Sequence, residues 1–267
     1  MNNEHTTRED DWTPPLGRHH TGHGSRNANS ATTDDCDNRD NYDKSYFEQR
    51  RWYPTEENRN GNYARKIWGG ACPIKGTAAE QYLLSRRIRG SSVSSLAYAR
   101  LNAGKSNYHC LVARVQNAVG ETCAISRTFL SQDGKSKANI EAPRRSLGAM
   151  SGGAVRLGQV QDQVILCEGL EDGLTLQQRL GIPVWVALGT SFLPKVELPP
   201  SVTKVIVAQD NDEPGAEAAE ETAKVWFERG CESSIMRPPS GFKDFNELLM
   251  SLPLSTGGFD IPAGERL

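Results

Sequence analysis

The chain has 267 residues, a formal net charge of −2 and a hydrophobic fraction of 37%. Because domains average about 150 residues, this length accommodates one large domain or two small ones. The sequence contains no run of about 18 apolar residues and no apolar segment near its start, so we expect neither a membrane-spanning helix nor a secretory signal.

Charge is distributed unevenly along the chain. Residues 1–60 carry 8 basic and 12 acidic side chains, residues 61–160 carry 15 and 4, and residues 161–267 carry 8 and 17. The near-neutral total therefore combines a basic block with an acidic one. Either the two blocks neutralise each other across a domain interface, or the basic block binds a polyanion beside a carboxylate-rich metal site.

Residues 1–60 are rich in Asn, Asp, Thr, Arg, Gly and His and contain almost no Ile, Leu or Val. Such a segment cannot bury enough apolar surface to offset the entropy lost on ordering. We predict a disordered polar tail. An aromatic group near its end could dock on a partner or on the rest of the chain, and it consists of Tyr46, Phe47, Trp52 and Tyr53.

Residues 61–160 are predicted to form a small, basic α+β region. The sequence from Thr77 to Glu80 resembles a capping box, which indicates a short helix through Leu84. The β-rich runs 109–115 and 122–130 are separated by a short turn, so they predict an antiparallel hairpin. Residues 154–157 indicate a further strand.

Residues 161–252 alternate strand and helix signals, which predicts an α/β domain with a parallel sheet flanked by helices and right-handed crossovers. The predicted strands are 164–167, 184–188, 205–208 and 234–236. The predicted helices are 172–180, 214–229 and 244–250. Residues 253–267 are predicted to form a C-terminal tail.

Carboxylates follow two of the predicted strands directly. Glu168 ends the first strand, and Asp210 and Asp212 end the third. Ligands of open parallel sheets bind beyond the carboxyl ends of the strands, where these side chains would converge. Carboxylates placed so close together require a cation, and oxygen ligands suit Mg²⁺ or Mn²⁺ rather than zinc. Phosphoryl or nucleotidyl transfer is the chemistry that follows.

Three motifs in this order resemble the Toprim domain, which bacterial primases, topoisomerases and some nucleases share. They are Glu168-Gly with Asp172 four residues on, Asp210-x-Asp212-x-x-Gly215, and the run from Lys243 to Leu249. The resemblance covers residues 164–250. It implies a Toprim-like parallel sheet flanked by helices, preceded by the small basic α+β domain and the N-terminal tail.

The basic region is also similar to a known type. Residues 127–130, 133–137 and 152–157 resemble the region that precedes the Toprim domain in phage- and plasmid-type primase-like proteins. The resemblance to the Toprim domain implies that Glu168 acts as general acid or base and holds the metal with Asp210 and Asp212. Asp172 and Lys243 would be supporting catalytic residues.

Eight basic side chains are candidates for binding nucleic acid, because clustered Lys and Arg can grip successive phosphates. They are Arg86, Arg87, Arg114, Arg127, Lys135, Lys137, Arg144 and Arg145. Three aromatic residues close by could stack on bases of a single strand, namely Tyr98, Tyr108 and Phe129. Alternatively, the aromatic residues belong to the core and the charges form a solvated surface.

Two other signals are rejected. Residues 99–106 fit a loose P-loop pattern, but a strand rather than a helix is predicted after them, so we expect no nucleotide-driven motor. The 6 cysteines include no C-x-x-C pair, and His19, His20, His23 and Cys36 lack zinc-finger spacing, so no zinc is expected. Free thiols are expected in a reducing, cytoplasmic setting.

Three functions remain open. The first is a primase-like nucleotidyltransferase that acts on single-stranded DNA and nucleoside triphosphates with Mg²⁺ or Mn²⁺. The second is a metal-dependent nuclease or nicking enzyme, since the same carboxylates can serve cleavage. The third is a non-catalytic nucleic-acid-binding replication protein of a mobile genetic element, with a degenerate Toprim fold. A separate helicase or replication protein is a further expected partner, and a membrane is not.

Overall fold

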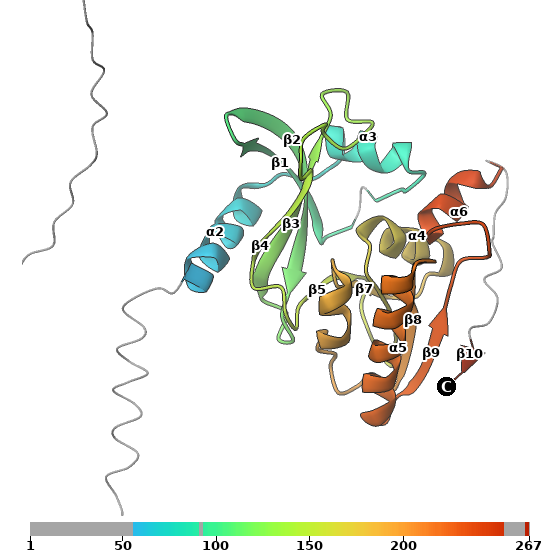
Figure 1. Cartoon of the computed structure of the whole chain (residues 1–267). Coiled ribbons are helices and arrows are strands. Elements are labelled where there is room, and N and C mark those ends of the chain that lie inside the picture. Colours follow the sequence, from blue (N-terminus) through green and yellow to red (C-terminus); the bar gives the residue numbers. More distant parts are fainter. Residues whose placement is uncertain (1–55, 91–92, 254–264, 267) are drawn as a thin grey trace, which may run out of the picture. The chain divides into compact units, whose positions relative to one another are not determined.

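The structure is a computed structural model that describes residues 56–90, 93–253 and 265–266 (Figure 1). Most of the predicted N-terminal tail lies outside the described residues, as does most of the predicted C-terminal tail. The aromatic group at 46–53 and the candidate zinc ligands His19, His20, His23 and Cys36 also lie outside them.

One mixed sheet of ten strands runs through the described residues. The strand order is β10-β9-β8-β6-β7-β5-β2-β3-β4, and β1 pairs with β2 off this path. The strands of residues 163–236 are parallel, and those of residues 96–157 are antiparallel. The predicted α/β fold class is confirmed.

The first half of the described chain is antiparallel and carries two helices. Its elements are α2 (Glu56–Gly70), α3 (Ala78–Ser85), β1 (Leu96–Ala103), β2 (Ser106–Gln116), β3 (Thr122–Leu130), β4 (Arg144–Gly148) and β5 (Ala154–Leu157). The predicted helix and hairpin are confirmed. Thr77 caps α3 by accepting a hydrogen bond from the Ala79 amide at 3.2 Å.

The second half alternates strands and helices as predicted. Its elements are β6 (Gln163–Cys167), α4 (Leu170–Leu180), β7 (Val184–Val186), the 3₁₀ helix η1 (Thr190–Lys195), β8 (Lys204–Ala208), α5 (Glu213–Glu228), β9 (Glu232–Met236), α6 (Phe245–Ser251) and β10 (Glu265–Arg266). The strands β7, β6, β8 and β9 are consecutive parallel neighbours.

Strand β6 is apolar from Val164 to Cys167, and these residues are buried on both of its faces. Val164 and Leu166 belong to a core cluster with α5 residues such as Trp226, whereas Ile165 and Cys167 belong to a cluster with Leu174 of α4. We call these two sides the α5 face and the α4 face of the sheet. Helix α2 packs against strands β3 and β4 through a third cluster that includes Ala64.

The sequence-based predictions missed several elements. Helix α2 begins at Glu56, so the predicted polar tail overlaps a helix, and strands β1 and β4 were not predicted. The rejection of the P-loop is confirmed, because residues 99–106 form the end of β1, a turn at Gly104 with φ of 64°, and the first residue of β2.

Helix length and polarity bear on membranes. Within the described ranges, none of the helices combines the length and the apolar character that crossing a bilayer requires.

Candidate active site

The carboxylates at the strand ends lie at one edge of the sheet. Strands β6 and β8 pair in parallel with Cys167 opposite Ala208, so the residues that follow both strands leave the sheet together. Glu168 follows β6, Asp210 follows β8, and Asp212 caps the N-terminus of α5 by accepting from the Gly215 amide at 2.9 Å. The predicted convergence rests on this pairing.

Two glycines permit the close packing at this edge. A Cβ atom at Gly169 would lie 2.5 Å from Oδ2 of Asp172, and one at Gly215 would lie 2.9 Å from the Asp210 carbonyl oxygen. Both distances are shorter than real Cβ contacts allow. The Glu168-Gly169 pair and the spacing from Asp210 to Gly215 therefore have a steric cause.

Asp172 is the most buried of the predicted site residues, with 6% of its surface exposed. Its Oδ1 accepts a hydrogen bond from the Asn246 amide at 2.9 Å. Burial, together with the charges of Asp244 and Asp210, raises the pKa of Asp172 to about 8. Through this hydrogen bond, Asp172 of α4 is joined to Asn246 of α6 next to the other carboxylates.

The other carboxylates also repel one another. Burial raises the pKa of Asp210 to about 6, with further contributions from Glu168, Asp244 and Asp212, while Lys243 acts in the opposite direction. Burial likewise raises the pKa of Glu168, an effect that Arg144 opposes and Asp212 reinforces. Charges of one sign that are packed this closely favour the binding of a cation.

The carboxylates are neighbours rather than a complete ligand shell. Among the described residues, no group of three or more His, Cys, Asp or Glu side chains is arranged to hold a metal ion. Mg²⁺ is usually held by one or two carboxylates together with waters and substrate phosphates. The donor chemistry at this edge, all oxygen and with raised carboxylate pKa values, fits such an ion.

Lys243 lies beside the carboxylates, since its charge opposes the rise in pKa of both Asp210 and Glu168. Its side chain is exposed, and its backbone holds the loop in place. The Lys243 amide donates to Glu247 Oε2 at 2.6 Å, and its carbonyl accepts from the Asn211 amide at 2.7 Å. Asp244 next to it caps α6 through the Glu247 amide at 2.7 Å.

Sequence reasoning missed two asparagines that build this site. Asn211 donates through Nδ2 to the carbonyls of Pro238 at 3.0 Å and Phe242 at 2.8 Å. It thereby ties the loop after β8 to the loop before α6. Asn246 donates through Nδ2 to Thr175 Oγ1 at 3.0 Å. Asn246 lies within the Lys243–Leu249 motif, and this position is the sequence signal that could have identified it.

Among the predicted nucleic-acid-binding residues, Arg144 has a charge that opposes the rise in the pKa of Glu168, and its side chain is exposed. Lys135 is exposed too. Arg86 is half-buried, and its guanidinium lies 5.8 Å from the centre of the Tyr82 ring. Lys135 lies in the connection between β3 and β4, Arg144 is the first residue of β4, and Arg86 is the C-cap of α3.

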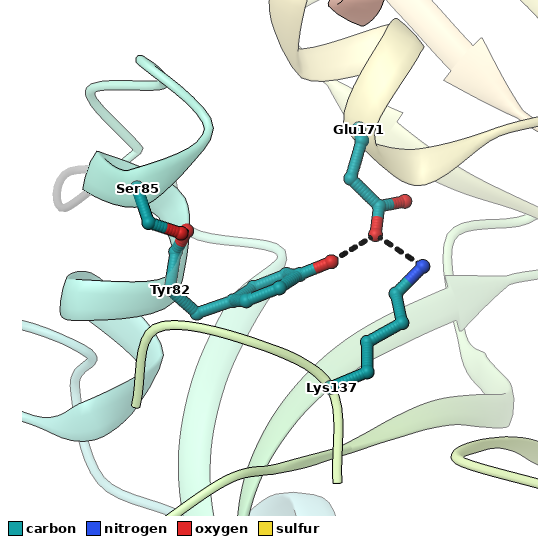
Figure 2. Close-up of polar contacts among 4 residues, drawn as sticks. All are labelled: Tyr82, Ser85, Lys137 and Glu171. Carbon is teal, nitrogen blue, oxygen red and sulfur yellow. Dashed lines mark hydrogen bonds and ion pairs between the residues drawn. The ribbon is translucent and has the colours of Figure 1, made fainter. Parts of the chain in front are cut away.

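Two other predicted binding residues hold the halves of the chain together. Arg87 donates to the carbonyls of Leu249, at 3.3 Å, and Leu252. Figure 2 shows Lys137 meeting Glu171 of α4, with 2.9 Å between Nζ and Oε1. The same carboxylate oxygen accepts from the Tyr82 hydroxyl at 2.6 Å. Both cations are therefore engaged in intramolecular contacts.

The remaining three predicted binding residues lie on the sheet face that α2 covers. The guanidinium of Arg114 lies 5.2 Å from the Trp68 ring centre, and that of Arg145 lies 5.5 Å from the Phe129 ring centre. Arg127 donates to the Ser146 carbonyl at 3.1 Å. Phe129 is fully buried, which agrees with the alternative that it belongs to the core.

The cysteines of the described residues are free thiols, as expected. Cys110 and Cys167 are buried in strands, and Cys123 is half-buried. Burial raises the pKa of the Cys110 thiol to about 12, so this thiol is unreactive at neutral pH.

Comparison with protein families divides the chain at the junction of the two sheet halves. Residues 163–252 match the family model described as the Toprim domain. Residues 58–157 match a model described as a domain of unknown function, DUF7146. No curated protein matches the sequence of this chain.

Among solved structures, the chain is similar to a crystal structure of the zinc-binding and RNA polymerase domains of the Aquifex aeolicus primase. The identity is 15% and the TM-score 0.50, over 78% of this chain and 64% of that one, so the chain spans less than two thirds of that structure. A DNA primase domain from Pseudomonas aeruginosa gives 12% identity and a TM-score of 0.49, covering 72% and 74% of the two chains. The primase fragment of the bacteriophage T7 primase-helicase protein gives 17% and 0.42, covering 64% of each.

Proposed function

We propose that the protein is a primase-like nucleotidyltransferase, because residues 163–252 match the Toprim domain and a basic region precedes them in the chain. It would act on single-stranded DNA and nucleoside triphosphates by Mg²⁺-dependent phosphoryl transfer. The observation that carries the proposal is the group of mutually repelling carboxylates at the ends of β6 and β8. The Aquifex aeolicus protein is described as a primase with an RNA polymerase domain, and we assign the same class of activity.

We assign the site residues three roles, namely metal binding, phosphate contact and positioning. Glu168, Asp210 and Asp212 would hold the ion, whose charge offsets that of the substrate phosphates when it is bound. Lys243 is exposed beside them and would contact a phosphate oxygen. Asp172, which is buried against the Asn246 amide, would position α4 rather than touch substrate.

In the proposed reaction, the 3′ hydroxyl oxygen of the growing strand forms a bond to the α-phosphorus of the incoming nucleotide. The bond from that phosphorus to the bridging oxygen breaks, and pyrophosphate leaves. Glu168 would accept the hydroxyl proton, since its raised pKa brings it closer to neutral pH than an ordinary carboxylate.

Single-stranded DNA would approach along the exposed basic residues that adjoin the carboxylates. Arg144 and Lys135 are exposed, and Arg144 is within electrostatic range of Glu168. Contacts of this kind lose affinity as salt concentration rises. Residues 99–106 form a hairpin and would contribute no motor activity. A helicase or replication protein is the further partner that we propose.

A second candidate is a nucleic-acid-binding protein without catalysis. The observation in its favour is that no group of three metal-ligating side chains is assembled among the described residues. A metal-dependent nuclease would use the same carboxylates, so only the reaction products separate it from a primase.

The deciding experiment incubates the full chain with single-stranded DNA, labelled nucleotides and Mg²⁺ or Mn²⁺. New short oligomers support the primase, shortened template supports the nuclease, and salt-sensitive binding without either product supports the non-catalytic protein. Asp210→Asn should abolish the activity and also remove the rise in Tm that Mg²⁺ gives the wild type. Glu221→Gln, an exposed carboxylate of α5 outside the site, is the matched control. Full activity in Asp210→Asn would contradict the assignment of the site.

A further inference from the structure

A pocket of about 310 Å³ opens on the α5 face of the sheet, where the antiparallel half meets the parallel half. It is lined by Arg114 of β2, Arg156 of β5 and Trp185 of β7, with Ser94 and Gln159 at its sides. None of the carboxylates of the candidate active site lines it. The pocket is therefore separate from the site described above.

Strand register places the two arginines next to each other. Val115 of β2 pairs with Val155 of β5, so the adjoining residues Arg114 and Arg156 share the opposite face of the ladder. Arg156 in turn pairs with Trp185. The row Arg114, Arg156, Trp185 thus crosses three neighbouring strands of the sheet.

Each guanidinium is held against an indole ring. The Arg156 guanidinium lies 4.1 Å from the Trp185 ring centre, and that of Arg114 lies 5.2 Å from the Trp68 ring centre. Arg156 also donates through Nη2 to the Ala118 carbonyl at 3.2 Å and to the Asn117 carbonyl. These contacts fix the orientation of both cations before any ligand arrives.

The charges of the two arginines are left without a counter-ion in this part of the structure. No carboxylate lines the pocket, and the Nε atoms of Arg114 and Arg156 are buried without a hydrogen-bond partner among the described residues. Burial and the nearby Arg114 charge lower the pKa of Arg156. Two cations confined in this way favour an anion between them, as clustered carboxylates favour a metal ion.

We propose that this pocket binds a phosphate group through the guanidinium groups of Arg114 and Arg156. Arginine presents fixed N–H donors that match phosphate oxygens, and Ser94 and Gln159 can add neutral hydrogen bonds. The phosphate could belong to a nucleotide or to the backbone of a nucleic-acid strand. The proposal does not depend on the proposed catalytic function, because it uses no residue of the carboxylate group.

The test measures binding of inorganic phosphate and pyrophosphate to the full chain by calorimetry, in EDTA and at constant ionic strength. EDTA removes any metal-assisted binding at the carboxylates. The variant Arg156→Gln removes one cation, and Gln159→Glu adds a carboxylate to the pocket lining at an exposed position while both arginines stay in place. Arg229→Gln is the matched control, since Arg229 also stacks on an indole, 4.6 Å from the Trp226 ring centre, but does not line the pocket.

We expect Arg156→Gln to weaken phosphate binding about tenfold or more, the effect of losing a charge-assisted hydrogen bond. Gln159→Glu should weaken it to a similar degree because the new carboxylate repels the anion, while Arg229→Gln binds as the wild type does. If Arg156→Gln fails to fold, Gln159→Glu alone decides. A wild type that binds neither anion, or a Gln159→Glu variant that binds as well as the wild type, overturns the proposal.

The source of the phosphate is found by repeating the titrations with a nucleoside triphosphate and with a single-stranded oligonucleotide. The ligand whose binding falls in Gln159→Glu but not in Arg229→Gln is the one that the pocket takes. A loss confined to inorganic phosphate and pyrophosphate assigns the pocket to the free anion.

Discussion

Glu171 shows how a single carboxylate can connect the two halves of the sheet. Its Oε1 accepts from the Tyr82 hydroxyl of α3 and pairs with Lys137, which follows β3 (Figure 2). Only 14% of the Glu171 side chain is exposed. Burial alone would raise the pKa of Glu171, but Lys137 and the Tyr82 hydroxyl outweigh it and hold the pKa below its ordinary value.

The sign of the resulting pH dependence follows from this lowered pKa. The folded state binds the Glu171 proton less tightly than the unfolded state does, so the contribution to stability is present above the unfolded pKa of about 4.3 and is lost as pH falls below it. We expect Glu171→Gln to lower the free energy of unfolding by about 1–3 kcal/mol at neutral pH.

Urea denaturation of the wild type and of Glu171→Gln between pH 3 and pH 7 measures this difference. It should stay constant in the neutral range and shrink in acid. Glu221→Gln, an exposed carboxylate of α5, serves as the control and should change stability little at any pH. A difference that grows as pH falls would contradict the assignment.

Among the helices and strands, those that are most buried are the ones that the sequence predicts best. Strand β6 is apolar on both faces and was predicted within a residue of its true start. The edge strand β4, Arg-Arg-Ser-Leu-Gly, carries exposed polar residues and has no such pattern. Helix α2 contains a central Gly61 and several Asn residues, so it forms through packing of Ala64 and Trp68 on the sheet rather than through propensity.

The candidate site follows the same rule. Glu168, Asp210 and Asp212 could be predicted because strand ends fix their positions, whereas Asn211 could not, because its role depends on a loop far away in sequence. Lys137 and Arg87 have the residue type of phosphate contacts. Their engagement by Glu171 and by the carbonyls at the end of α6 is tertiary information that residue type does not carry.

Gly215 provides a test of how tightly the loop after β8 is packed. A Cβ atom there would lie 2.9 Å from both the Asp210 carbonyl oxygen and Asp212 Oδ1. Because one of these atoms is backbone, relief requires the loop that carries both aspartates to move. We expect Gly215→Ala to destabilise the protein by about 1–3 kcal/mol and to reduce activity together with Mg²⁺ binding.

Thermal denaturation with and without Mg²⁺ measures both effects. Gly69→Ala is the control, since Gly69 lies in helix α2 with no atom within 4 Å of the added Cβ, so it should leave stability unchanged or raise it slightly. An unaltered Tm in Gly215→Ala would show that the loop adapts freely.

At the scale of the whole described chain, one sheet contains both the basic region and the Toprim domain. Strand β5 pairs with β2 on one side and with β7 on the other, so hydrogen bonds run without interruption from β4 to β9. The largest core cluster also spans both regions, from Ile74 and Leu83 to Leu174 and Phe245. The two family matches therefore do not correspond to two separate cores.

This continuity predicts that residues 56–253 unfold in one cooperative transition rather than two.

A contact between the two regions can be removed by mutation. The Arg87 guanidinium donates to the carbonyls of Leu249 and Leu252. Arg87→Ala should lower Tm by several degrees, since about 1 kcal/mol shifts the Tm of a chain this size by about 2–4 °C, and the transition should stay single. Trp68 lies in α2 and Trp226 in α5, so the fluorescence of variants that keep only one of these two tryptophans reports the two regions separately. Coincident curves support one cooperative unit, and curves that separate in the wild type would mean that the basic region and the Toprim domain fold independently despite their shared sheet.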